Sequence, residues 1–531
     1  MESKDEKILN FFEGSNENKE IININQISEK KIKKTYIIFF SLLMLIIVGF
    51  STFFILGPIK EESYNNMNDK EKLFMKIEEE TCDKGENEKC LTCKGDHCGS
   101  CNIGYKLKEG KCVFTYSFKA TYEVTDLNKM VRLFKYDEKK TFKIINLQFN
   151  GKNYNSLTSN FFPLPKAGRY ELYVLLDITE STSFFEMFYF FENLISISFS
   201  DDFNTKNITN MTRMFAYALN AVSINISSFN TENVKSMDMM FYDCQKLTSI
   251  GISVSNTLNL VSMDYMFQKC ELLRSIDLSS FKTPKLEKME DLFWDSKSLT
   301  SINISNLITK NVKNLCGVFY NCQSLRSINL SNFDTSNVST MRSMFQNCKS
   351  LTSIDISNFN TKNVINMDSI FSGCQSLTSI DISSFDTSNT IELSRMFYDC
   401  KKLTSIDVSH FNTKNSNRMI AMFNNCQSLK SINVSNFNTS NTNDVLSMFF
   451  GCSLLTSLDL KNFDTESITS FKSMFGSCPK LTYVDISSFT TNTTYVNLFY
   501  RPAAKGTLKV KKEFFDKMAD LLTGWSIIFV E

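Results

Sequence analysis

The chain has 531 residues, and its 58 basic and 57 acidic residues give a formal net charge of +1. This balance gives no support to a polyanionic partner, so nucleic acid is excluded. The length is enough for several domains or for one long solenoid, and a strict internal repeat favours the solenoid.

The N-terminal region is predicted to anchor the chain in a membrane. Residues 1–35 are polar and form the predicted cytoplasmic tail, and residues 36–59 contain no charged side chain. At about 1.5 Å per residue, a helix of this length crosses a hydrocarbon core of about 30 Å. The alternative is a cleaved signal peptide, whose apolar part is usually shorter, about 7–15 residues, and closer to the terminus. Four lysines precede the run, so the positive-inside rule predicts a single-pass signal-anchor protein of the cell membrane with an extracellular C-terminal region.

A charged stalk is expected at residues 60–81, and a cysteine-rich module follows at residues 82–112. Its two C-x2-C pairs are only four residues apart, whereas zinc ribbons usually separate such pairs by about 15–20 residues. Disulfides are favoured over zinc because the module is predicted on the oxidising side of the membrane. The stretch CNIGYKLKEGKC resembles the end of EGF-like and growth-factor-receptor cysteine-rich modules. The candidate disulfide cysteines, whose pairing stays open, are Cys82, Cys90, Cys93, Cys98, Cys101 and Cys112.

Short apolar alternations continue through residues 113–186, among them FKATYEV, FKIINLQF and YELYVLL. Turn formers separate them, so we expect a small β unit of about four to six strands. This unit is placed to cap the first repeat, which would otherwise expose its apolar end.

Residues 187–500 contain a repeat of 26 residues, and such a period indicates a stacked-repeat solenoid. In the stretch LTSIDIS, which begins at Leu351, the apolar residues should face inward and Asp355 should face outward on a concave parallel β-sheet. Val364, Met367 and Phe371 then follow the spacing of one helical face, which predicts a short helix or helical turn on the convex side. The fold class is therefore a leucine-rich-repeat-like solenoid with a parallel β concave face and short helical or irregular convex segments.

Stacking aligns equivalent residues of successive repeats into columns. Phenylalanines recur every 26 residues from Phe215 to Phe475, and we interpret this stripe as core rather than as a ligand site. Cysteines form a second column in which Ser296 fills one position. Disulfides between neighbouring repeats are one interpretation, and reduced packing residues are the favoured one. The column consists of Cys244, Cys270, Cys322, Cys348, Cys374, Cys400, Cys426, Cys452 and Cys478.

The words LTSIDISNFNTKNV and the following MF-x-x-C, repeated about a dozen times, resemble the BspA-like leucine-rich-repeat surface proteins. These include the bacterial surface protein 26-residue repeat and the mycoplasmal lipoprotein-type repeat. The resemblance implies surface exposure and adhesion to host or matrix components. It also implies that residues 501–531 are a C-terminal cap. The chain departs from the family in its N-terminal anchor and in lacking a lipobox cysteine.

Aspartates recur at one outward position of the predicted strands and form the candidate ligand face. One interpretation is a strip that binds cations or a basic or hydroxyl-rich ligand, and the other is a solvated surface that keeps the strands soluble. The residues are Asp277, Asp355, Asp381, Asp407, Asp459 and Asp485.

No catalytic set, cofactor motif or metal motif accompanies the repeats, whose single histidine is His410. We therefore expect a non-enzymatic adhesion or recognition protein that binds a protein, glycan or matrix component. The alternatives are a receptor that signals through a partner and a structural coat protein.

Overall fold

The computed structural model describes residues 90–94, 97–101, 105–108, 111–114, 116–125, 130–135, 142–155, 159–253, 256–490, 498–518 and 522–530. The predicted tail, membrane span and stalk lie outside these residues. Within the described ranges, no helix is long and apolar enough to cross a membrane.

The cysteine-rich stretch is described as two backbone hairpins. Strands β1 (Cys90–Lys94) and β2 (His97–Cys101) are antiparallel, as are β3 (Tyr105–Lys108) and β4 (Lys111–Phe114). In the first hairpin Cys90 is opposite Cys101, and Cys93 is opposite Cys98. Cys82 lies outside the described residues, so the disulfides remain a prediction.

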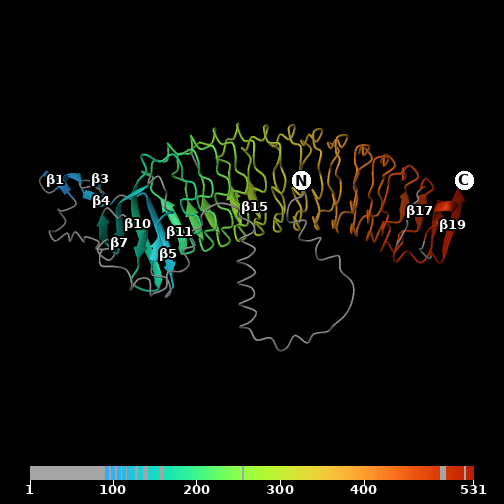
Figure 1. Ribbon diagram of the computed structural model, residues 1–531, viewed down its shortest axis with the longest axis horizontal. Helices are drawn as coiled ribbons and strands as arrows, with labels where there is room; N and C mark the ends of the chain where they lie inside the picture. The colour runs from blue at the N-terminus through green and yellow to red at the C-terminus, as the bar shows by residue number, and fades with distance from the viewer. Residues whose placement is uncertain are drawn as a thin grey trace, which may run out of the picture. The chain divides into compact units, whose positions relative to one another are not determined.

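An antiparallel sheet precedes the repeats and continues into them (Figure 1). Its central strand β5 pairs with β10 on one side and with the first repeat strand, β11, on the other. Phe118, Ala120 and Tyr122 of β5 are buried, and Phe118 packs edge-on against Phe188 of the first repeat. The strands of this sheet up to the first repeat are β5 (Phe118–Val124), β7 (Lys143–Phe149), β8 (Lys152–Asn155), β10 (Gly168–Asp177) and β11 (Leu194–Phe199). Strands β6 (Met130–Arg132) and β9 (Phe161–Pro163) pair with each other in a separate two-stranded sheet.

The repeats form a β-solenoid whose rungs stack in chain order (Figure 1). Parallel strand pairing is offset by one repeat, so that Ser223 is opposite Ser249 and Asp459 is opposite Asp485. The solenoid predicted from the 26-residue period is therefore confirmed. The remaining elements are β12 (Ser223–Asn225), β13 (Ser249–Gly251), β14 (Ser275–Asp277), β15 (Ser301–Asn303), β16 (Ser457–Asp459), β17 (Tyr483–Ile486), β18 (Gly506–Lys511), α5 (Lys512–Phe515) and β19 (Trp525–Val530).

The parallel sheet is less continuous than predicted. Between β15 and β16 the equivalent residues, such as Ser353 to Asp355, face outward but form no strand. Paired strands lie about 4.7–4.9 Å apart. The ring centroids of the phenylalanine column next to these residues are 6.4 Å apart from Phe411 to Phe437 and from Phe437 to Phe463. The spacing is 6.5 Å from Phe463 to Phe489, in the two rungs where β16 and β17 pair, so ring spacing does not explain where the pairing is lost.

The other long side of each rung, equivalent to residues 341–347, is called the turn ladder here. The N–H groups of Met341, Ser343, Phe345 and Asn347 all donate to carbonyls of the next rung, at 2.6–3.0 Å. Ser343 and Asn347 have φ of 57° and 60°, which is left-handed backbone. An α-helix instead bonds internally from residue i to residue i−4, with φ near about −63°. The helical form of the predicted convex segment is therefore not observed, because alternate N–H groups bond along the solenoid. Two consecutive turns are formed instead, which corresponds to the irregular alternative of the prediction.

Two buried columns hold the rungs together. The phenylalanines from Phe215 to Phe475 are fully buried, and consecutive rings are stacked at 5.3–6.5 Å. Burial of each ring contributes roughly 1.5–3 kcal/mol, so the column is core, as predicted. The repeat cysteines are free, and Cys374 Sγ, for example, donates to the Phe345 carbonyl at 3.2 Å. Ser296 makes the same bond to Phe267 at 2.7 Å, which explains how serine can replace cysteine in this column.

Candidate functional site

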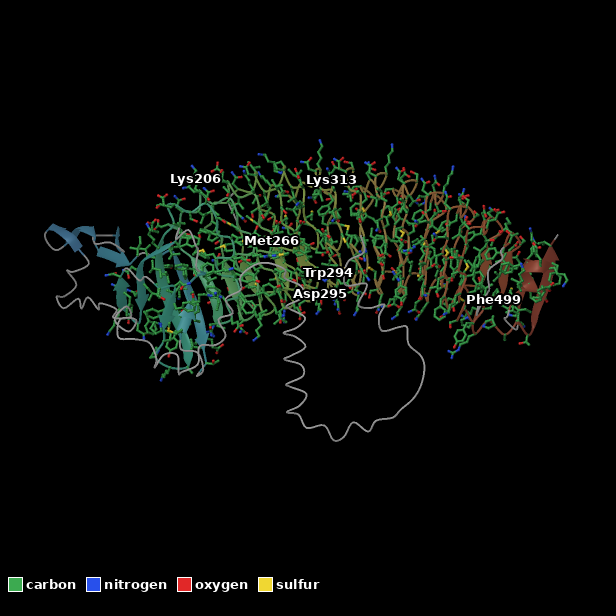
Figure 2. The ribbon with its side chains drawn as sticks, viewed as in Figure 1. Lys206, Met266, Trp294, Asp295, Lys313 and Phe499 are labelled. Carbon is green, nitrogen blue, oxygen red and sulfur yellow. The ribbon has the colours of Figure 1, made fainter. Side chains whose placement is uncertain are left out.

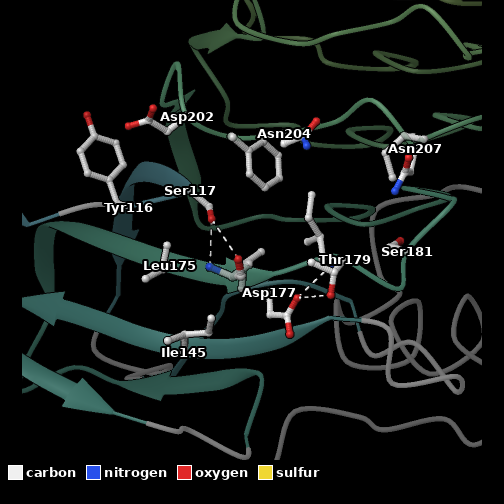
Figure 3. A pocket seen from close by; sticks show the side chains of 14 residues that line it. Tyr116, Ser117, Ile145, Leu175, Asp177, Thr179, Ser181, Asp202, Asn204 and Asn207 are labelled. Carbon is white, nitrogen blue, oxygen red and sulfur yellow. Dashed lines mark hydrogen bonds between the residues drawn. The ribbon is translucent and has the colours of Figure 1, made fainter. Parts of the chain in front are cut away.

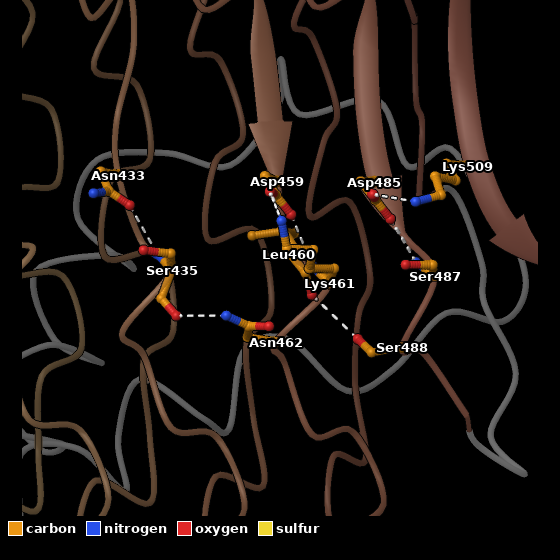
Figure 4. Close-up of polar contacts among 10 residues, drawn as sticks. All are labelled: Asn433, Ser435, Asp459, Leu460, Lys461, Asn462, Asp485, Ser487, Ser488 and Lys509. Carbon is orange, nitrogen blue, oxygen red and sulfur yellow. Dashed lines mark hydrogen bonds and ion pairs between the residues drawn. The ribbon is translucent and has the colours of Figure 1, made fainter.

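The six predicted aspartates lie on one face of the rungs, called the strand face, and each caps a turn. In Asp355, Asp381 and Asp407, Oδ1 accepts the backbone N–H of the serine two residues later, at 2.9–3.1 Å. Asp277 makes the equivalent bond, as do Asp459 and Asp485 (Figure 4). Such side-chain bonds end a strand by offering its backbone a local partner. In each of these six rungs, one carboxylate oxygen of the aspartate therefore caps the turn of its own rung.

Hydrogen bonding also explains the ionisation of these carboxylates. Bonds from Ser357 lower the pKa of Asp355, and the equivalent serines lower the pKa of Asp277, Asp381 and Asp407. Asparagine fills the same position in Asn303, Asn329 and Asn433 and accepts the same N–H. A neutral amide replaces the carboxylate freely, so capping accounts for the column without a ligand.

The strand face also carries a column of exposed serines, one position before the inward apolar residue of each strand. Among the described residues their hydroxyls make no hydrogen bond. The column includes Ser275, Ser301, Ser327, Ser353, Ser379, Ser405, Ser431 and Ser457. The next equivalent position is Tyr483, which is opposite Ser457 and 38% exposed.

A buried threonine column, which sequence reasoning missed, joins each rung to the next. Thr361 Oγ1 donates to the Asp386 carbonyl at 2.9 Å and accepts the Asp386 N–H at 2.8 Å. Thr335 makes the same pair of bonds with Asn360. The repeated F-x-T in the sequence was the available signal, and the residue has a structural role.

A cavity of about 500 Å³ lies where the N-terminal sheet meets the first repeat (Figure 3). Tyr116, Asp177 and Asn207 are among its lining residues. Asp177 Oδ1 accepts from the Thr179 N–H at 3.0 Å and from its hydroxyl at 2.7 Å, and these bonds lower its pKa. No histidine or cysteine is among its described lining residues, and the Ser117 hydroxyl is bonded to the Leu176 backbone.

A third region, also missed from the sequence, lies on the turn ladder of three consecutive rungs. We call it the acidic–aromatic patch, and it consists of Asp264, Tyr265, Glu290, Asp291, Trp294 and Tyr320. Trp294 and Asp295 lie along the edge opposite to Lys206 and Lys313 (Figure 2). The available signal was the acidic residue two positions before the MF-type pair in successive repeats, at Asp238, Asp264 and Glu290.

Burial raises the pKa of the carboxyl groups in this patch. Desolvation is the largest cause at each, and it raises the pKa of Asp264 to about 6 and that of Asp291 to about 7. Neighbouring carboxylates add to both shifts, and the pKa of Glu290 is also raised by burial. No group of three or more His, Cys, Asp or Glu within the described ranges is arranged to hold a metal ion.

The repeats match a protein family described as "Mycoplasma protein of unknown function, DUF285", over residues 179–305, 218–328, 289–407, 313–432 and 392–507. Together these segments cover more than half of the chain. No curated protein matches it.

Three solved structures are similar at low identity. The chain described as "Crystal structure of TLR13-ssRNA13 complex" is 16% identical, with a TM-score of 0.19, and the match covers 55% of this chain and 50% of that chain. The pneumococcal vaccine antigen PcpA is 14% identical, with a TM-score of 0.24, covering 62% and 72% of the two chains. The functional domain of InlJ from Listeria monocytogenes, described as including a cysteine ladder, is 10% identical, with a TM-score of 0.14 and coverage of 58% and 64%.

Proposed function

The chain belongs to the DUF285 repeat family, and we propose that it is a cell-surface recognition or adhesion protein. It binds another protein, a glycan or a matrix component through the outer surface of its solenoid. The BspA-like resemblance of the repeats supports this role, because members of that group are surface-exposed and implicated in adhesion.

The observation that carries the proposal is the separation of structural from exposed positions within each rung. The phenylalanine, cysteine and threonine columns are buried and used for stacking. The strand-face aspartates cap their own turns. Variable side chains are thereby left on the turn ladder, which is a scaffold suited to binding and carries no catalytic set.

A binding panel tests this function directly. The full-length chain, labelled with a fluorophore, is applied to cells, glycan arrays and immobilised matrix proteins. We expect saturable binding to at least one member of the panel, which excess unlabelled chain abolishes. An absence of saturable binding anywhere on the panel would favour the structural coat alternative.

The uncharged run at residues 36–59, with four lysines before it, supports anchoring of the chain with its N-terminus in the cytoplasm. It also favours the receptor alternative, in which the tail signals through a partner. Deleting residues 1–29 separates the two roles, because adhesion should persist and signalling should be lost. Loss of adhesion in this deletion would contradict a recognition role confined to the solenoid.

A further inference from the structure

The aromatic side chains of the patch form a stacked, half-buried platform. The Trp294 and Tyr320 rings lie 3.6 Å apart between centroids, with 13° between their planes. Gly317 makes this possible, because a Cβ there would lie 2.7 Å from Trp294 Cε3 and 1.9 Å from Asp291 Oδ1. Gly317 also has a φ of 57°, which an L side chain adopts only with strain. Because Gly317 has no side chain, Asp291 and Trp294 of the preceding rung can occupy the space beside it.

Carboxylates lie along this platform in neighbouring rungs. Asp264 Oδ1 accepts the Glu290 N–H at 2.7 Å, and the Asp264 N–H in turn donates to Asp238 Oδ1 at 3.0 Å. Asp291 differs from these, because its Oδ1 is buried and has no hydrogen-bond partner among the described residues. A buried carboxyl oxygen without a partner disfavours the ionised form, which agrees with the raised pKa of Asp291.

Two cations lie near the patch. Arg342 lowers the pKa of Asp291, and its Nε lies 3.5 Å from Asp368 Oδ2 in another rung. Lys288 lowers the pKa of Asp264, which also faces the carboxylates of Asp238 and Glu290. Asp291 faces Glu290 and Asp264 as well, and the Cys316 thiol lies in the same cluster. Despite these cations, the pKa of both aspartates is raised overall, and their carboxyl groups lie beside stacked aromatic rings.

We propose that the acidic–aromatic patch is the docking surface for a cationic partner, an extended protein segment rich in arginine and lysine. This inference rests on the proposed recognition function and specifies where the partner binds. Guanidinium groups stack on tryptophan and tyrosine faces and pair with carboxylates through several N–H donors, so one side chain can use both parts of the patch. Charge complementarity selects a cationic segment over a neutral or acidic one.

Proton linkage gives the interaction a distinctive pH dependence. A cation binds the ionised carboxylates, and Asp264 and Asp291 ionise with pKa values of about 6 and about 7. Carboxylates of ordinary pKa, about 4, are already ionised at pH 5 and add no such change. Affinity for the cationic segment should therefore rise at least about tenfold from pH 5 to pH 8, because each unit of pKa shift corresponds to a tenfold factor.

Titration calorimetry of the full-length chain with a nona-arginine peptide tests the proposal. At pH 8 we expect one class of saturable site, with proton release seen as a dependence on the ionisation enthalpy of the buffer. The double variant Asp264→Asn, Asp291→Asn should lose at least about tenfold in affinity and most of the pH dependence. Asparagine keeps an acceptor for the Glu290 N–H, so this variant retains the local backbone bond.

A matched control separates the patch from general electrostatics. The triple variant Asp355→Asn, Asp381→Asn, Asp407→Asn removes charge from the strand face and should leave the affinity within about twofold, because exposed rim charges contribute little. Trp294→Ala should weaken binding. Trp294→Phe keeps an aromatic ring, so it should retain part of the affinity, and it replaces the alanine variant if that variant misfolds.

Equal weakening by the strand-face and patch variants would overturn the proposal, as would binding that does not change between pH 5 and pH 8. If the peptide fails to bind while the chain still binds cells or matrix proteins, the patch assignment alone is wrong. If neither binds, the recognition function is wrong as well.

Discussion

The strand face and the turn ladder repeat with the same period but differ in what varies along them. On the strand face, Asp and Asn alternate at one position, and both accept the same N–H two residues later. On the turn ladder, most backbone bonds recur from rung to rung, with a break at Met289, while outward side chains include Asp264, Trp294 and Arg342. Regular columns therefore mark structural roles in this solenoid, and departures from regularity mark the candidate recognition surface.

The largest expected effect comes from the core of the turn ladder. Phe345→Ala should destabilise the solenoid by about 3–5 kcal/mol, because the ring is fully buried between Phe319 and Phe371. Chemical denaturation followed by circular dichroism measures this loss. The exposed Ile365→Ala, at a side chain that is 48% exposed, is the control and should cost less than about 0.5 kcal/mol. Similar losses in the two variants would contradict a core role for the column.

The acidic–aromatic patch should make the folded chain less stable as pH rises from 5 to 8. Burial raises the pKa of Asp264 to about 6 and of Asp291 to about 7, so these groups bind protons more tightly in the folded chain. The stabilisation by these protonated groups is fully present below the ordinary carboxyl pKa and is lost as pH rises through 6 and 7. Thermal melting at pH 5, 6.5 and 8 should show a falling Tm.

Asp291→Asn is the matched variant for this pH effect. It should raise Tm at pH 8 and flatten the profile, because the amide carries no charge to bury. A parallel pH profile in the variant and the wild type would show that other groups control this window.

Thr361→Val tests the buried threonine column. The substitution leaves both the N–H and the carbonyl of Asp386 without their partner, and it should cost about 2–4 kcal/mol. Thr361→Ser keeps both bonds and should retain most of the stability. Denaturant midpoints of the two variants are compared. Equal midpoints for valine and serine would contradict a stabilising role for the threonine hydroxyl bonds.

The smallest effect is expected on the strand face. Changing Asp355, Asp381 and Asp407 together to Asn should leave Tm unchanged at pH 7, because Asn329 and Asn433 cap equivalent turns. The same three positions changed to Ala should lower Tm, since no acceptor remains for the three N–H groups. Differential scanning calorimetry compares the two triple variants. Equal Tm values would contradict the explanation that Asp and Asn recur at this position because they cap the turn.

The sequence predicted those features that depend on spacing alone. A 26-residue period was enough to place Phe345 and Cys374 in buried columns, because identical positions of stacked rungs must meet. Spacing could not distinguish a helix from consecutive turns, since Ser343 and Asn347 adopt left-handed backbone without the glycine that usually signals it.

The acidic–aromatic patch was equally out of reach from spacing. It depends on which outward side chains of neighbouring rungs meet, such as Trp294 with Tyr320 and Asp291 beside Gly317. The capping role of the strand-face aspartates did leave a periodic signal, a serine two residues after the Asp or Asn of successive repeats, as in Asp355 and Ser357. A ligand for this face remains a prediction.

Hydrogen exchange with mass spectrometry, on the full-length chain with and without nona-arginine at pH 8, tests most directly which surface recognises a partner. We expect slower exchange on addition of the peptide in the turn-ladder segments 262–272, 288–297 and 314–323. We expect unchanged exchange in the strand-face segments 352–357, 378–383 and 404–409. Protection of the strand-face segments, or equal protection of both sets, would contradict recognition through the turn ladder.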